Sequence, residues 1–303
     1  MSEIGRRQFL STVGTAAVGG LFHSRDARAQ MMLPEKPGVI RPGYAAITWG
    51  GNDAQAIDEI ADVGFKGIQL RASAFDTWGK KPETLRTLLE KRGLTLVALS
   101  SGNLNIDPGN EQQQIDLHLQ HAAFVRDAGG KLVQVIDEKP KGRAVTADDY
   151  RRLGRLLNEI GGRTAKLGVP LVYHHHMNSI GETPAGIDAI LGASDAEAVG
   201  LLLDIAHYTQ GGGDPVQAIR RYYKRIRLVH LKDVVATPDP PGYRWVELGK
   251  GRVNVKGSVA GLRAVRYDGW AIVELDRVDP PQTPKSAAIA NRDFVVNELK
   301  LAL

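Results

Sequence analysis

The chain has 303 residues, with 39 Lys and Arg, 34 Asp and Glu, 8 His and no Cys, which gives a formal net charge of +5. The absence of Cys excludes disulfide frameworks, thiolate zinc sites and a cysteine nucleophile. No apolar run reaches the roughly 18 residues of a membrane helix, and the basic residues are not clustered as they are in nucleic-acid-binding proteins. We therefore expect a globular protein with no stable membrane anchor and no nucleic-acid partner.

The first 29 residues predict an export signal. The run RRQFL at residues 6–10 resembles the twin-arginine signature, a Gly/Ala-rich stretch follows at 13–22, and ARA at 27–29 has the pattern of a cleavage site. An ordinary amphipathic N-terminal helix is the alternative. We expect a signal peptide at 1–29, read by the twin-arginine export machinery, then a lead segment at 30–42. The mature protein would be periplasmic or secreted from a bacterium.

From residue 43 onward, short apolar runs alternate with amphipathic segments. The predicted strands cover residues 44–48, 67–70, 94–99, 132–136, 169–173, 199–203, 226–231 and 270–275. The predicted helices cover residues 53–63, 82–92, 112–127, 147–166, 184–191, 215–223, 255–265 and 286–301. Eight such units predict one (β/α)8 TIM barrel over residues 43–303. The alternative is a doubly wound open sheet, but GGND at 50–53 is not the G-x-G-x-x-G turn typical of that fold.

Polar and aromatic side chains follow six of the predicted strands. They are Trp49, Asp137 and Glu138, then His174, His175 and His176, then Asp204 and His207, then His230, Lys232 and Asp233, and finally Glu274, Asp276 and Arg277. A TIM barrel builds its active site at these carboxyl ends. Five of the seven His residues after position 29 stand there. The other two, His118 and His121, lie on a predicted helix, where we expect packing or surface roles.

Strand periodicity places His174 and His176 on one face of the fifth strand and His175 on the other. If His174, Asp204, His230 and Glu274 all point inward, they form a mixed nitrogen and oxygen set. Such a set suits one divalent Mn, Co, Zn, Fe, Ni or Mg ion better than Ca²⁺.

Each of these side chains also has a purely structural interpretation. The histidines could form a buried polar cluster, and Asp204 could cap a turn. Glu274 could form an ion pair with Lys232 or Arg277.

The strand-end segments resemble those of the xylose-isomerase-like TIM barrels, which include sugar isomerases, epimerases and inosose dehydratases. The similar segments are ITWG at 47–50, LVYHHHM at 171–177, GLLLDIAH at 200–207, GDP at 213–215, VHLKD at 229–233, VELGKGRV at 246–253 and WAIVELD at 270–276. The resemblance implies that Asp204, His230 and Glu274 are metal ligands. It also implies that His207 contacts substrate hydroxyls and that Trp49 forms a wall against the sugar ring.

Two positions depart from the family pattern. His174 stands where the epimerases carry a Glu, and Gln69 stands where many relatives place a Glu. His174 is expected to be the fourth ligand. Alternatively, Glu138 reaches the metal and His174 supports the ligands from behind.

We expect the acid/base chemistry to come from His176, Lys232 and Glu274. Trp49, His207, Glu138 and Arg277 are expected to contact the substrate.

The predicted function is a metal-dependent isomerase or epimerase that acts on a sugar or polyol through an enediolate. One alternative is a dehydratase or lyase on inosose or 3-keto-glycoside substrates, because elimination begins with the same proton abstraction. The other is a non-catalytic periplasmic sugar-binding barrel. The superfamily that the chain resembles also includes abasic-site endonucleases, but strands one to three here end in Trp49, Arg71 and Ser100 rather than in further metal ligands. A phosphate handle is less expected, although GKGR at 249–252 keeps it open, and a homodimer is the default oligomer.

Overall fold

A computed structural model of the chain describes residues 36–303. The predicted signal peptide at 1–29 and the start of the predicted lead segment lie outside the described residues. No helix in the described part of the chain is long and apolar enough to cross a membrane.

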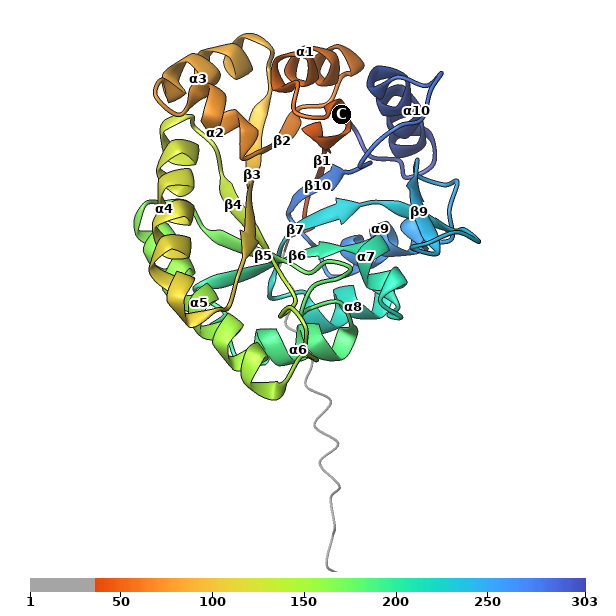
Figure 1. Cartoon of the computed structure of the whole chain (residues 1–303). Coiled ribbons are helices and arrows are strands. Elements are labelled where there is room, and N and C mark those ends of the chain that lie inside the picture. Colours follow the sequence, from red (N-terminus) through yellow and green to blue (C-terminus); the bar gives the residue numbers. More distant parts are fainter. Residues whose placement is uncertain (1–35) are drawn as a thin grey trace, which may run out of the picture. The chain divides into compact units, whose positions relative to one another are not determined.

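Eight parallel strands close into a barrel, which confirms the predicted fold (Figure 1). They are β1 (Ile40–Ala45), β2 (Gly67–Arg71), β3 (Thr95–Leu104), β4 (Leu132–Asp137), β5 (Leu171–His174), β6 (Val199–Asp204), β7 (Ile226–Leu231) and β10 (Gly269–Val273). Sequential strands are neighbours, and β10 closes the barrel against β1. Strands buried on both faces read as continuous apolar runs, and for this reason the sequence pattern revealed them.

Ten α-helices and two short 3₁₀ helices of the described chain lie outside the barrel or in its loops (Figure 1). They are η1 (Ala46–Trp49), α1 (Asp53–Val63), α2 (Ser73–Trp78), α3 (Pro82–Lys91), η2 (Pro108–Asn110), α4 (Glu111–Asp127), α5 (Ala147–Lys166), α6 (Pro184–Gly192), α7 (Ile205–Gln210), α8 (Pro215–Tyr222), α9 (Val255–Ala264) and α10 (Pro284–Asn297). The longest, α5, begins at a capping box in which Thr146 and Asp149 satisfy each other's backbone N–H groups. Its apolar face, with Leu153, Leu157 and Ile160, is fully buried against the barrel.

The first strand differs from the prediction. It begins at Ile40 rather than at residue 44, and residues Ala46–Trp49 form η1 instead of the end of a strand. Pro42 and Gly43 concealed the strand, because both residues are depleted in strands. Gly43 is needed for packing: a Cβ there would lie 2.5 Å from Ile272 Cδ1 and 2.8 Å from the carbonyl oxygen of Gly67.

An antiparallel hairpin follows β7 and was not predicted. It consists of β8 (Asp233–Ala236) and β9 (Tyr243–Val246), which pair with each other and not with the barrel. The strands are short and the turn is rich in Pro, so the segment gave no clear periodicity. The hairpin stands beside the barrel mouth (Figure 1).

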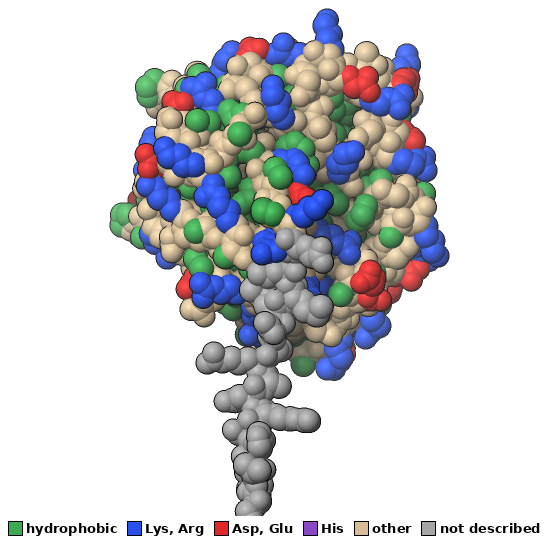
Figure 2. All heavy atoms as spheres, turned by 180° about the vertical axis from the view of Figure 1, so that it is seen from behind, with side chains coloured by type: hydrophobic (Ala, Val, Ile, Leu, Met, Phe, Trp, Pro, Cys, Tyr) green, Lys and Arg blue, Asp and Glu red, His purple; other side chains and the backbone are tan. Residues whose placement is uncertain are grey.

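Charged side chains are mixed over the surface. Figure 2 shows one face, on which Lys and Arg side chains are scattered with apolar and acidic side chains between them. Part of the net charge of +5 also belongs to residues 1–29, which carry four Arg, one Asp and one Glu.

Candidate active site

The carboxyl ends of β5, β6, β7 and β10 bring the four predicted ligands together, all of them buried. Asp204 Oδ2 lies 3.6 Å from His174 Nε2 and 3.5 Å from His230 Nδ1. Glu274 Oε2 also lies 3.5 Å from His230 Nδ1. The ligand atoms form two overlapping groups that share Asp204. One contains His230 and Glu274, and the other contains His174 and His207.

Asp204 uses its two oxygens differently. Oδ1 accepts the N–H groups of Ala206 and His207 at 2.8 Å each and so caps α7. Oδ2 has no hydrogen-bond partner. Burial raises the pKa of Asp204, but neighbouring His207, His174 and His230 hold that pKa well below its ordinary value. One carboxylate therefore caps α7 with Oδ1 and leaves Oδ2 facing the cluster.

Three buried atoms without hydrogen-bond partners converge at this point: His174 Nε2, Asp204 Oδ2 and His230 Nδ1. Unpaired buried polar atoms are costly and call for an explanation. Imidazole nitrogens with carboxylate oxygens are a donor set for first-row divalent metals. The residues of this cluster therefore fit the expected metal.

Lys232 is a buried cation beside this cluster. Its Nζ donates to Glu274 Oε1 at 2.9 Å and to Asp276 Oδ1, and it lies 4.5 Å from the centre of the Trp245 ring. Burial lowers the pKa of Lys232, but Asp276, Glu274 and Asp204 together raise it above its ordinary value. Burial raises the pKa of Glu274, yet His230 and Lys232 bring it down to about 2. Neither group is therefore a ready proton acceptor.

The rings of His176 and His207 are in close contact, with centroids 3.8 Å apart and planes inclined by 39°. The Met177 N–H donates to His207 Nδ1 at 3.1 Å, and His176 Nδ1 lies 2.7 Å from the Met177 carbonyl oxygen. A backbone N–H can only donate and a carbonyl can only accept. Lys232 Nζ lies 3.5 Å from His207 Nε2, a longer contact than the one that the Met177 N–H makes at Nδ1. The neutral imidazole of His207 therefore carries its proton on Nε2, whereas His176 carries a proton on Nδ1, which the Met177 carbonyl accepts. Burial holds the pKa of His207 well below its usual value.

His175 points away from the cluster, as the strand alternation predicted. Its Nε2 accepts the backbone N–H of Asp204 at 3.2 Å, and its ring lies 5.8 Å from that of Tyr208. Burial lowers the pKa of His175 to about 3, so it is a neutral structural residue.

Two of the predicted substrate contacts, Trp49 and Glu138, have other partners in the structure. Trp49 Nε1 donates to Glu59 Oε2 at 2.8 Å, and Glu138 accepts from Asn103 Nδ2 at 3.2 Å. Arg277 is exposed, but it lines a pocket of about 390 Å³ beside Asp276. Glu138 is in neither group of possible ligands.

The pocket beside Asp276 is walled by residues that the sequence analysis did not single out. Tyr243 and Trp245 of β9 line it, and the Trp245 ring lies 4.5 Å from that of His207. The only signal for them was a pair of aromatic residues in the segment after the seventh strand. The hairpin therefore supplies an aromatic wall next to the histidines.

The GKGR segment does not offer a phosphate site. Asp233 Oδ2 accepts the N–H groups of Gly249 and Gly251, and Asp233 Oδ1 accepts that of Val253. A Cβ on Gly251 would lie 2.1 Å from Asp233 Oδ1. Asp233 thus occupies the backbone N–H groups of this loop, and they are not available to bind the phosphate of a substrate.

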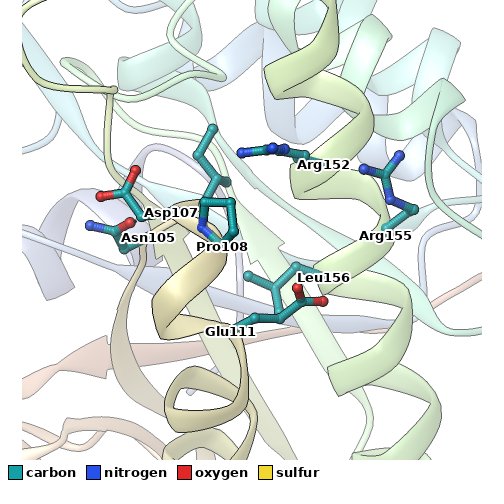
Figure 3. Close-up of a pocket in the computed structure, with 8 residues that line it drawn as sticks. Asn105, Asp107, Pro108, Glu111, Arg152, Arg155 and Leu156 are labelled. Carbon is teal, nitrogen blue, oxygen red and sulfur yellow. Dashed lines mark hydrogen bonds between the residues drawn. The ribbon is translucent and has the colours of Figure 1, made fainter.

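Two further features lie apart from the cluster. The pocket in Figure 3 is formed by the loop after β3, the start of α4 and α5, with Arg152 and Arg155 on α5, and no predicted site residue lines it. His118 and His121 are buried and share Ser101 Oγ at 2.6 and 2.7 Å. Both histidines pack in the core, which agrees with the packing role, and not the surface role, that the sequence left open.

The chain is similar to known proteins in sequence and in fold. The sequence pattern of the family described as xylose isomerase-like TIM barrel matches residues 57–295. The inosose dehydratase of Lacticaseibacillus casei is 28% identical over 296 residues, covering 85% of this chain and 96% of that protein. Inosose dehydratase 2 of Bacillus cereus (strain ZK / E33L) is 27% identical, covering 86% and 97%.

Solved structures show the same fold. An L-ribulose 3-epimerase superposes with a TM-score of 0.71 at 20% identity, covering 86% of this chain and 95% of that one. The IOLI protein, solved with a bound zinc atom, also gives 0.71, at 17% identity and with 86% and 98% covered.

Proposed function

Because the chain belongs to the xylose isomerase-like TIM barrel family, we propose that it is a metal-dependent dehydratase of a keto-polyol or keto-sugar. It removes the proton next to the carbonyl and expels the β-hydroxyl as water. Elimination takes precedence over the isomerisation or epimerisation that the sequence favoured. The inosose dehydratases of Lacticaseibacillus casei and Bacillus cereus match this chain over almost their whole length, whereas the L-ribulose 3-epimerase shares its fold at 20% identity.

The observation that carries this proposal is the close contact between His176 and His207 beside the cluster that could hold a metal. Met177 gives the two rings opposite tautomers, so one nitrogen accepts a proton and the other donates a hydrogen bond. His176 Nε2 is the proton acceptor, since Lys232 and Glu274 are held as an ion pair.

Asp204, His230 and Glu274 would hold the metal, which when bound supplies Lewis acidity to a substrate carbonyl. The ammonium of Lys232 and the Nε2–H of His207 stabilise negative charge that develops on substrate oxygens. His176 takes the proton from carbon, and the C–H electron pair forms the new double bond. The same proton then passes from His176 to the departing hydroxyl, which leaves as water.

A single proton acceptor suits elimination better than two-base epimerisation. Epimerisation needs a proton taken from one face of a carbon and returned to the other. The family's paired carboxylates would serve that purpose, but His174 stands in the position of one of them. Epimerisation stays as the second candidate because of the fold shared with L-ribulose 3-epimerase.

The test is incubation of the metal-loaded chain with inososes and keto-sugars in D₂O. Mass spectrometry measures loss of water, and NMR measures exchange of the carbon-bound proton. We expect water loss, abolished by a chelator and by His176→Gln, with His118→Gln as a remote histidine control. Exchange without water loss would replace the dehydratase with an isomerase or epimerase. Ligand-induced stabilisation with neither reaction would indicate a sugar-binding barrel.

We also propose export through the twin-arginine route, which rests on residues 6–10 and 27–29 alone. Replacing Arg6 and Arg7 by Lys should leave the protein in the cytoplasm, as fractionation and immunoblotting would show. Unchanged export of that variant would contradict the proposed twin-arginine signal.

A further inference from the structure

Four buried side chains form a hydrogen-bonded chain across the barrel interior from β7 to β5. His230 Nε2 lies 2.9 Å from Gln69 Oε1, Gln69 Nε2 donates to Gln134 Oε1 at 3.0 Å, and Gln134 Nε2 lies 2.8 Å from His174 Nδ1. All four side chains are almost wholly shielded from solvent. We call Gln69 and Gln134 the glutamine relay.

The relay has a direction. Each amide has one oxygen that accepts and one NH₂ that donates. When two amides are joined by an N–H···O bond, one end of the pair presents an oxygen and the other presents an NH₂. Turning both amides reverses the direction but does not change this asymmetry. Oxygens at both ends would force two NH₂ groups against each other at 3.0 Å.

The two ends of the relay therefore impose opposite hydrogen-bonding roles on the two histidines. One imidazole donates its N–H to the relay and keeps a lone pair toward Asp204. The other accepts from the relay, and when neutral it must direct its own N–H toward Asp204. Because a metal-binding nitrogen must be unprotonated, only one of the two can be a neutral ligand with its second nitrogen satisfied.

The surrounding groups decide the direction. The group that contains His174 also needs His207 Nε2, which carries a proton because the Met177 N–H occupies His207 Nδ1. The group that contains His230 has the two carboxylates Asp204 and Glu274, each 3.5 Å from Nδ1. The His230 group is the better metal site, and it requires the relay oxygen to face His230.

We propose that the glutamine relay makes His230 the single imidazole ligand and gives His174 an N–H that points at Asp204, so that His174 is not a ligand. Gln69 and Gln134 are thus positioning residues that act through the two imidazoles. His230 carries its proton on Nε2 and faces the metal with Nδ1. His174 carries its proton on Nε2 and faces Asp204 Oδ2, 3.6 Å away. The inference rests on the metal site of the proposed function.

The experiment uses the zinc-loaded full chain with ¹⁵N-labelled histidine at pH 8. We expect both His174 and His230 to show the Nε2–H tautomer, because the relay joins them through different nitrogens. In Gln134→Glu the new carboxylate accepts from both sides. His174 should then shift to Nδ1–H while His230 keeps Nε2–H. Gln69→Glu should give the same shift and is the second variant if Gln134→Glu does not fold.

Metal stoichiometry gives an independent readout. His230→Ala should lose stoichiometric zinc, whereas His174→Ala should keep it with an affinity lower by about 10-fold, as for residues that support ligands. X-ray absorption should count one imidazole on zinc in the natural protein and two in Gln134→Glu. Gln134→Met is the matched control, since it removes the amide without adding an acceptor, and its count should stay at one.

Two imidazoles on zinc in the natural protein, or mixed tautomers of His174 and His230, would overturn the proposal. Its failure can be distinguished from failure of the proposed function. If the natural protein binds no zinc, the proposed function fails, but the relay still requires His174 and His230 to share one tautomer in the metal-free protein. Mixed tautomers there would refute the relay by themselves.

Discussion

The two halves of the barrel carry similar polar residues at their strand ends, but these residues differ in whether they are paired with other groups of the fold. At the mouths of β1 to β4 they are paired within the fold: Trp49 with Glu59, Asp53 with Ser73, and Asp137 with Tyr173. At the mouths of β5, β6, β7 and β10, three unpaired buried atoms face one another. His118 Nε2 and His175 Nδ1 are also unpaired, but no group of possible ligands in the described chain includes either residue. Convergence of unpaired atoms, rather than burial of polar residues, distinguishes the candidate site.

The largest expected difference between the two halves of the barrel is the one between the variants Asp204→Asn and Asp137→Asn. We expect Asp204→Asn to lose bound metal and activity together, because the amide places an NH₂ where an oxygen faces His230. Asp137→Asn should keep its metal. Metal analysis after gel filtration decides this. Equal metal content in both variants would contradict the assignment of the site to the second half.

His176→Gln should slow carbon-proton exchange by about 10²- to 10⁴-fold, the range typical of a lost general base. Its metal content should stay unchanged, since His176 belongs to neither ligand group. Single-turnover kinetics with metal-loaded protein measures the effect. A rate within a few-fold of the natural protein would require another proton acceptor.

Lys232→Met should destabilise the fold by about 3–5 kcal/mol, the usual cost of leaving a buried charge without its partner. Glu274 and Asp276 would be left facing each other without the ammonium between them. Denaturant unfolding measures the loss. A Met variant as stable as the natural protein would show that water reaches these carboxylates.

Asp137 should make its own contribution to the pH dependence of stability. Burial raises the pKa of Asp137 to about 6, above its ordinary value of 3.8, despite hydrogen bonds from Tyr173 and the Ile180 N–H. The folded state therefore binds the proton more tightly than the unfolded state does. The stability that this proton provides is complete below about pH 4 and is lost as the pH rises to about 6, by at most about 3 kcal/mol.

Unfolding of the natural protein and of Asp137→Asn between pH 4 and 7 isolates this contribution. The difference between their free energies of unfolding should shift against the natural protein as the pH rises. A constant difference would show that Asp137 keeps an ordinary pKa in the fold.

Glu138→Gln should have the smallest effect. Glu138 accepts a 3.2 Å hydrogen bond from Asn103, and it belongs to neither ligand group. An amide oxygen can accept the same bond, so we expect stability within about 0.5 kcal/mol and unchanged metal binding. Loss of metal in Glu138→Gln would restore the sequence-based alternative in which this residue is a ligand.

The sequence alone determined the barrel and the half whose strand ends carry the clustered polar residues. Strands buried on both faces leave apolar runs, and their polar ends are visible as breaks in those runs, as in the run that ends at Asp204. Glycine residues indicated where helices end, and Gly64 at the end of α1 has the positive φ, 108°, that glycine adopts at such ends. The edges of β1 and the hairpin of β8 and β9 were not predictable in this way, because Pro and Gly hide periodicity in short segments.

Only the tertiary structure decided what each polar side chain does. Residue type did not reveal that Asp204 divides its oxygens between a helix cap and the site, or that Lys232 is held as a cation. Nor did it show that Asp233 fills the glycine loop or that Gln69 and Gln134 connect His230 to His174. These roles depend on which atoms face each other from strands far apart in sequence. The pattern along one strand shows only to which face each side chain points. The hydrogen-bond partners that set its protonation come from other strands across the barrel.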